Sequence, residues 1–233
     1  MRKFFLLLIT IFISNLIFAQ QYNFRKFSLE QGLPQSTIYC IAQDNNNFIW
    51  LGTEGGGLVR FDGKQFKTYT KKNGLASNII RSILIDKNNK IWVGTDNGIN
   101  ILDGYGIKTI NKENNLSGNT ILKLYQDNNS NIWAATNDGG INKIKINNDS
   151  IIIKSYTTDN GLPTNFVFDV FQDKNSNIWL AQYGGLTKLV FKNDSLTNVK
   201  NLTTFEGLPS DVILNITADK DGNFWCGTYD KGA

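Results

Sequence analysis

Five tryptophans recur at nearly regular intervals, and this regularity constrains the fold more than any other feature of the chain. They lie 42, 41, 46 and 46 residues apart, at Trp50, Trp92, Trp133, Trp179 and Trp225. An aspartate stands six residues before each of them: Asp44, Asp86, Asp127, Asp173 and Asp219. A Gly-Leu or Asn-Leu pair stands eighteen residues before each, so that repeats start near residues 32, 74, 115, 161 and 207. Three anchors held in frame five times indicate five copies of one structural unit.

The first unit has the pattern of short strands joined by tight turns. Apolar runs over 38–43, 48–53, 58–61 and 66–69 are separated by clusters of Asn, Asp and Gly, which are residues that favour turns. No apolar pattern in the unit has the period of a helix. A four-stranded antiparallel unit of this length, repeated along a chain, is typical of a β-propeller blade. The sequence therefore predicts an all-β fold, with a partial propeller over residues 20–233.

Two features of the unit predict how blades pack. A tryptophan at one fixed place in each blade would fill the space against the neighbouring sheet, and Trp225 would be the most exposed because no complete blade follows it. The position two residues after each tryptophan is always small: Gly52, Gly94, Ala135, Ala181 and Gly227. A small residue there lets the next blade approach closely.

The two ends of the repeat array are incomplete. Phe24 and Phe27 have the spacing from Gly32 that the fourth strand has in the other units, so residues 22–28 are expected to form an orphan outer strand that completes the last blade. The fifth unit stops in the turn after its second strand. We expect the chain to be a fragment of a longer protein, with a five-bladed ring that lacks one strand as the alternative.

The N-terminus has the layout of a secretory signal peptide. Arg2 and Lys3 precede an apolar stretch over residues 4–18, and Ala19 supplies a small residue at the expected cleavage point. Residues 1–19 would then be removed, and the protein would lie in the periplasm or cell envelope. The alternative, an uncleaved anchor, is disfavoured because the stretch is shorter than the roughly 20 residues of a membrane-spanning helix.

Composition excludes several classes of site. The sequence has no histidine, which removes histidine-based catalysis and histidine metal ligands. The net charge of +4 is too weak a bias to indicate nucleic-acid binding. Residues 219–223 begin like a calcium loop but lack the later glutamate, so a plain turn is expected. No metal or other cofactor is predicted, and Cys40 and Cys226, on different strands, are expected to remain thiols.

The units resemble the two-component regulator propeller repeat. The resemblance rests on motifs such as Gly161-Leu162-Pro163, Asn177-Ile178-Trp179 and Gly184-Gly185-Leu186, and it covers residues 22–233. Unit three departs from the pattern with Asn115 in place of glycine, and unit four with Ala181-Gln182 in place of Gly-Thr. The resemblance implies a periplasmic sensor region that detects oligosaccharides. It further implies, as partners beyond this chain, more blades, a β-sandwich and a histidine kinase or other output domain.

Comparison of the five units with one another points to a candidate binding surface. The position four residues after each tryptophan varies most in chemistry: Glu54, Asp96, Asn137, Tyr183 and Tyr229. Loops on a repeated scaffold often carry function, and carboxylates, amides and tyrosine rings suit an oligosaccharide. We therefore predict these five as ligand-binding residues. The alternative is that they are ordinary turn residues.

Three classes of function remain open from the sequence. A sensory binding module without catalytic residues is favoured. A structural or protein-docking propeller of the cell envelope is the second candidate. A glycan-degrading enzyme is the third, because Glu54 and Asp96 could form a carboxylate pair. Lys123 and Asp169 occupy the same place on the first strands of units three and four and could pair beside the central channel, either directly or through water. The longer outer hairpins near residues 147–149 and 193–194 are interpreted as tolerated surface variation.

Overall fold

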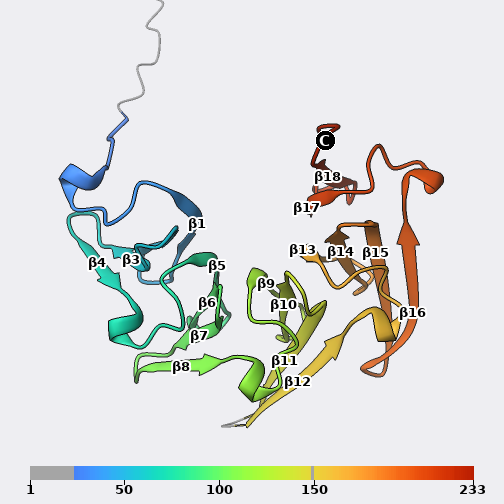
Figure 1. Ribbon diagram of the computed structural model, residues 1–233, viewed down its shortest axis with the longest axis horizontal. Coiled ribbons are helices and arrows are strands. Elements are labelled where there is room, and N and C mark those ends of the chain that lie inside the picture. The colour runs from blue at the N-terminus through green and yellow to red at the C-terminus, as the bar shows by residue number, and fades with distance from the viewer. Residues whose placement is uncertain (1–23, 148–149) are drawn as a thin grey trace, which may run out of the picture.

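The computed structural model describes residues 24–147 and 150–233, and these fold into five antiparallel sheets that follow one another in chain order. The sheets are arranged around an arc, with the first strand of each on the inside and, in the four-stranded sheets, the fourth strand on the outside (Figure 1). We call the sheets blades 1 to 5. The all-β prediction is confirmed. The predicted signal peptide, residues 1–19, lies outside the described residues.

Blades 1 to 4 have four strands each, and blade 5 has two in the described part of the chain. Blade 1 contains β1 (Ile38–Gln43), β2 (Ile49–Thr53), β3 (Leu58–Phe61) and β4 (Phe66–Tyr69). Blade 2 contains β5 (Ile80–Ile85), β6 (Ile91–Thr95), β7 (Gly98–Leu102) and β8 (Ile107–Ile110). Blade 3 contains β9 (Ile121–Gln126), β10 (Ile132–Thr136), β11 (Ile141–Asn147) and β12 (Ser150–Tyr156). Blade 4 contains β13 (Val167–Gln172), β14 (Ile178–Gln182), β15 (Gly185–Lys192) and β16 (Ser195–Leu202), and blade 5 contains β17 (Ile213–Ala218) and β18 (Phe224–Thr228).

The repeated aspartate and tryptophan are joined by one hydrogen-bonded turn. In blade 3, Oδ1 of Asp127 accepts backbone N–H groups from Asn129 and Asn131, each at 2.9 Å. The other carboxylate oxygen accepts the indole N–H of Trp133 at 2.8 Å. The same three contacts recur in every blade. The aspartate thus closes the turn and supplies the buried indole with its acceptor, which a buried polar group requires.

The tryptophans pack between blades as predicted. Trp50, Trp92, Trp133 and Trp179 are at most 9% exposed, whereas Trp225 is 57% exposed. The small residue two positions later is also explained. A Cβ added at Gly94 would lie only 2.8 Å from Cγ2 of Ile121 in the next blade, closer than side chains pack. The sequence repeat therefore encodes contacts between blades as well as the strands within them.

Each connection to a new blade contains a single turn of 3₁₀-helix, which the sequence reasoning did not predict. The five turns are η1 (Leu29–Gln31), η2 (Lys71–Asn73), η3 (Lys112–Asn114), η4 (Thr158–Asn160) and η5 (Thr204–Glu206). Each ends at the residue of the repeated Gly-Leu or Asn-Leu pair, which adopts a left-handed conformation, with φ of 93° at Gly32 and 69° at Asn115. Glycine and asparagine adopt this conformation most readily, which explains why these two types occupy the position.

The predicted strand over residues 22–28 is not present in residues 24–28, which have no strand conformation. A fourth strand forms only against a third, and the last sheet offers β18 as its outermost strand. Phe27 instead packs on blade 1, with its ring centroid 4.9 Å from that of Phe61 and 5.7 Å from that of Phe66. Residues 22 and 23 lie outside the described part.

The longer outer hairpin of blade 4 makes specific contacts with blade 3, so the interpretation of its length as surface variation is incomplete. Asn193 and Asp194 form the two-residue turn between β15 and β16, both with positive φ. Asp194 pairs with Lys143 of blade 3, and its Oδ2 lies 3.0 Å from Nζ of Lys145. Because the Lys143 side chain is only 9% exposed, this pairing neutralises a cation that the packing has largely buried.

We expect Asp194→Asn to lower the free energy of unfolding by about 1 kcal/mol at neutral pH, a small value because the carboxylate is half exposed. Hydrogen bonds from Lys143 and Lys145 lower the pKa of Asp194 below its ordinary 3.8. The stability that it contributes is therefore present above pH 3.8 and is lost as the pH falls below that value. Urea unfolding of both proteins at pH 7 and pH 3 checks this. The control is Asp138→Asn, whose partner Lys112 is exposed. An equal loss at both pH values would contradict the assignment.

No helix of the described residues is long and apolar enough to cross a membrane.

Candidate ligand site at the channel mouth

The first strand of every blade carries a β-bulge near its start. The register of pairing with the second strand shifts at this point in all five blades. The residue that the shift leaves unpaired stands eleven positions before the tryptophan: Tyr39, Arg81, Leu122, Phe168 and Leu214. A bulge redirects a side chain away from the regular alternation of the strand. Because the first strands form the inner side of the arc (Figure 1), the bulges lie around a common axis.

Four of these bulged residues line one open cavity of about 600 Å³. The lining residues are Arg81, Asp96, Thr120, Leu122, Asn137, Phe166, Phe168 and Leu214. Phe166 and Phe168 contact each other edge to face, with ring centroids 4.7 Å apart. The cavity therefore combines an aromatic side with a charged one, and its volume falls within the range of small-molecule sites.

The charged side of the cavity contains an ion pair within blade 2, between Arg81 in β5 and Asp96 just after β6. Arg81 pairs with Asp96 through two nitrogen–oxygen contacts, of which Nη2 to Oδ2 measures 3.3 Å. The guanidinium also lies over the ring of Tyr39, 5.6 Å from its centroid. Hydrogen bonding to Glu54 raises the pKa of Tyr39. The bulged residue therefore interacts with the residue four positions after the tryptophan in both blades: Tyr39 with Glu54 in blade 1, and Arg81 with Asp96 in blade 2.

The structure brings some of the predicted ligand-binding residues together and separates others. Asp96 and Asn137 line the cavity. Glu54 does not line it, but it interacts with Tyr39, whose ring lies against the lining residue Arg81. Tyr183 and Tyr229 are 64% and 75% exposed and are not among the lining residues. All five positions directly follow the last residue of the second strand. Glu54 and Tyr183 also form β-bridges with Ile79 and Val212, in the loops that lead into the following blades.

We call the cavity lined by the bulged residues the channel mouth. Next to it along the first strands of blades 2, 3 and 4, the side chain ten positions before the tryptophan joins its strand to the first strand of a neighbouring blade. Nζ of Lys123 lies 3.2 Å from Oδ1 of Asp169, so the predicted pair is direct. Oδ2 of Asp169 accepts the backbone N–H of Ile216 at 3.1 Å, and Oγ of Ser82 accepts that of Leu124 at 3.0 Å. These contacts join the first strands of neighbouring blades to one another.

Two other predicted features resolve as structural. Asp219 receives N–H groups from Asp221, Asn223 and Trp225, so its carboxylate serves the turn that every blade has. Within the described residues no group of acidic, cysteine or histidine side chains could hold a metal ion. Cys40 and Cys226 are both free thiols, as predicted, and burial raises the pKa of Cys40 to about 12.

The bulged residues are the part of the mouth that sequence reasoning missed. Their chemistry varies between units as much as that of the predicted set, with one cation, two aromatic rings and two leucines among the five. The same internal comparison, applied eleven residues before each tryptophan, would have found them. What the sequence does not reveal is the bulge that turns them toward the axis.

Comparison with known families identifies the repeat. Residues 32–55, 74–97, 115–138, 161–184 and 207–230, together just over half of the chain, match the two component regulator propeller. The chain belongs to the two component regulator propeller family. The predicted resemblance is thereby confirmed, including units three and four, which depart from its glycine pattern. A comparison with curated protein sequences finds no match.

Solved structures similar to this propeller share its fold at low sequence identity. The extracellular domain of the putative hybrid two component system BT3049 from B. thetaiotaomicron is 19% identical, with a TM-score of 0.52 over 89% of this chain and 41% of that one. PorZ, a surface component of the type-IX secretion system of Porphyromonas gingivalis, is 18% identical, with a TM-score of 0.66 over 91% and 34%. Virginiamycin B lyase from Staphylococcus aureus is 15% identical, with a TM-score of 0.65 over 84% and 65%. The chain thus spans less than two thirds of each of these proteins.

Proposed function

We propose that this chain is the ligand-sensing propeller of an extracytoplasmic signalling protein, without catalytic activity of its own, and that it binds an oligosaccharide at the channel mouth. The observation that carries the proposal is the cavity, where chemically different residues stand on a repeated scaffold. Membership of the two component regulator propeller family favours sensing over the other roles. In a longer protein, further blades and an output domain would follow.

The chemistry of the cavity suits a sugar chain. Phe166 and Phe168 offer ring surfaces against which the apolar face of a sugar can pack. The Arg81–Asp96 pair and Asn137 offer donors and acceptors for hydroxyl groups. The Arg81 and Asp96 side chains are 34% and 27% exposed, so both remain accessible to a ligand. Tyr183 and Tyr229 extend the same rim and would contact longer oligosaccharides.

Calorimetry with a panel of plant and microbial oligosaccharides tests the proposal. We expect one of them to bind, and Phe168→Ala to weaken its binding by about 1–3 kcal/mol through loss of the stacking contact. The matched control is Phe205→Ala in η5, because Phe205 is 96% exposed and does not line the cavity. Absence of binding across the panel, or an equal loss in both variants, would overturn the site.

The same samples separate sensing from the other two functions. Incubation of the bound oligosaccharide with the protein should leave it unchanged, as chromatography would detect. Cleavage of the sugar would contradict the sensor assignment and favour a glycan-degrading enzyme. Catalysis is compatible with this fold, because virginiamycin B lyase is an enzyme that shares it. A protein that binds no sugar but is retained by an envelope component would instead favour the docking role.

A further inference from the structure

Neighbouring blades enclose a groove beside Trp50, Trp92 and Trp133, and these grooves differ in whether the outer hairpin of the following blade fills them. Between blades 2 and 3, Ile146, Ile151 and Ile153 of the β11–β12 hairpin pack against the cluster that contains Trp92. Between blades 3 and 4, Phe191, Leu196 and Val199 of the β15–β16 hairpin pack against the cluster that contains Trp133. Both hairpins are the longer ones noted in the sequence.

The filled groove between blades 3 and 4 shows what chemistry this place accepts. The ring of Phe191 lies 5.6 Å from Trp133 and 5.4 Å from Tyr156, measured between centroids. Lys143, which pairs with Trp133 across β10 and β11, lies over both Trp133 and Phe191. Asp194 from the same hairpin neutralises this lysine. An apolar ring and a carboxylate therefore occupy the groove together.

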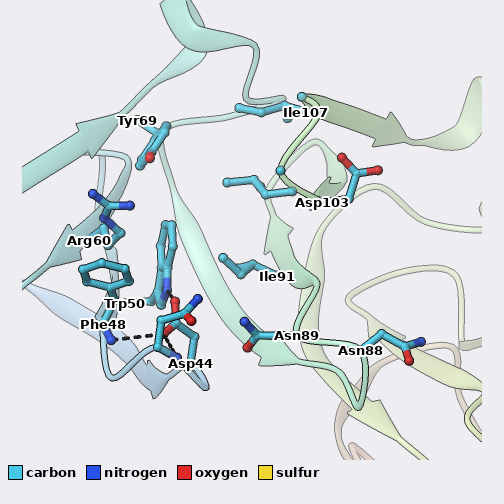
Figure 2. Close-up of a pocket in the computed structure, with 14 residues that line it drawn as sticks. Asp44, Phe48, Trp50, Arg60, Tyr69, Asn88, Asn89, Ile91, Asp103 and Ile107 are labelled. Carbon is cyan, nitrogen blue, oxygen red and sulfur yellow. Dashed lines mark hydrogen bonds between the residues drawn. The ribbon is translucent and has the colours of Figure 1, made fainter.

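The corresponding groove between blades 1 and 2 is open. The β7–β8 hairpin of blade 2 is short. It leaves a pocket of about 540 Å³ between Trp50 of blade 1 and Ile91 and Leu102 of blade 2. Figure 2 shows Phe48, Trp50, Arg60 and Tyr69 on one wall, with Ile91, Asp103 and Ile107 on the other. Aromatic and apolar side chains thus face each other across space that a hairpin occupies in blades 3 and 4.

Arg60 takes the place of Lys143 in this open groove. It pairs with Trp50 across β2 and β3, as Lys143 pairs with Trp133. Its guanidinium stacks on Phe48, 4.2 Å from the ring centroid. Nε of Arg60 is buried and has no hydrogen-bond partner, and Arg60 forms no salt bridge within residues 24–147 and 150–233. Buried donors normally have partners, and no acid is paired with this guanidinium as Asp194 is paired with Lys143. Asp62 is near enough to interact electrostatically with Arg60, but its carboxylate accepts the backbone N–H groups of Lys64 and Gln65.

The two carboxylates in the groove do not supply that acid. Asp44 already accepts three N–H groups, from Asn46, Phe48 and Trp50. Asp103 stands on the opposite wall (Figure 2) and accepts the backbone N–H of Tyr105 at 3.1 Å.

We propose that the groove between blades 1 and 2 is a second binding site, which takes a small carboxylate attached to an apolar ring. Arg60 binds the carboxylate, and the ring lies among Trp50, Tyr69 and Ile91, as Phe191 lies among Trp133 and Tyr156 in the next groove but one. This site is separate from the channel mouth and does not depend on the proposed function there.

Ligand-observed NMR of the purified protein with phenylacetate and with phenylacetamide tests the proposal. The two probes share a ring and differ in charge, so we expect phenylacetate to bind at least tenfold more tightly. Arg60→Gln should lower phenylacetate affinity roughly tenfold or more, because a hydrogen-bonded charge is lost. The matched control is Arg25→Gln, since Arg25 also stacks on a phenylalanine, 4.8 Å from the ring centroid of Phe27, but lies outside the groove.

A second variant keeps the test independent of Arg60. Gly106 lines the groove, and a Cβ added there meets no atom within 4 Å, so Gly106→Phe should fold normally and obstruct the site. We expect it to weaken phenylacetate binding while Arg25→Gln leaves it unchanged. Equal binding of the amide, or full phenylacetate binding by either Arg60→Gln or Gly106→Phe, would overturn the proposal.

Discussion

Asp127→Ala is expected to lower the free energy of unfolding by roughly 3–4 kcal/mol, because each buried donor left without a partner costs about 1–3 kcal/mol. The carboxylate of Asp127 accepts the indole N–H of Trp133, two backbone N–H groups and the side-chain amide of Asn131. Asn131 and Trp133 are 2% and 1% exposed, so water cannot replace the lost acceptor there. Urea unfolding followed by tryptophan fluorescence measures the effect.

The repeat supplies a matched control for this experiment. Asp219 makes the corresponding contacts in blade 5, but Trp225 is 57% exposed. The donors that Asp219 accepts can instead bind water, so Asp219→Ala should destabilise the protein much less than Asp127→Ala does. Equal losses in the two variants would contradict this explanation, because they would show that the cost does not depend on how deeply the turn is buried.

Gly140→Ala is the second substitution with a large expected effect, a loss of about 3–4 kcal/mol. Gly140 has a φ of 71°, which costs a residue with a side chain about 1–2 kcal/mol. A Cβ there would also overlap the carbonyl oxygen of Tyr156 and lie 3.2 Å from its carbonyl carbon. Because these are backbone atoms of β12, the strand must move, and overpacking of this kind costs about 1–3 kcal/mol more.

Gly104→Ala separates the two contributions. Gly104 has a φ of 90°, but a Cβ added there meets nothing within 4 Å. Only the conformational cost remains, so thermal unfolding should detect a loss of about 1–2 kcal/mol. A loss at Gly140 no greater than that at Gly104 would show that the sheet accommodates the methyl group without strain.

Much of the fold is predictable because a strand or turn expected in one repeat can be checked against the corresponding residues of the other four. The strands of the first unit are predicted to within one residue, since only Phe48 falls outside β2. The η turns are not predicted, because three residues are too few to produce a helical pattern. The strand over 22–28 fails in residues 24–28 because strand formation requires a partner strand, which the spacing of Phe24 and Phe27 cannot reveal.

The candidate sites are predictable only in part, since they depend on contacts between units. The period places Asp96 and Asn137 at corresponding positions, and the structure shows that they share a cavity. The bulge that redirects Phe168 has no sequence signal of its own. Hairpin length is visible in the sequence, but the packing of Phe191 over Trp133 joins different units, and within-unit patterns contain no information about it.

The turn glycines have a mechanical consequence. In each of blades 1 to 4, a glycine at or just before the start of the third strand donates its backbone N–H to the loop that precedes the following blade. The pairs are Gly57 to Asn78, Gly98 to Asn119, Gly140 to Asn165, and Gly184 and Gly185 to Asp211. Every such clamp joins consecutive blades only, so a load applied along the described chain is carried by the interfaces in series. Under a pulling force the blades should detach one after another, with the weakest interface yielding first, and the extension trace should rise in steps of one repeat length.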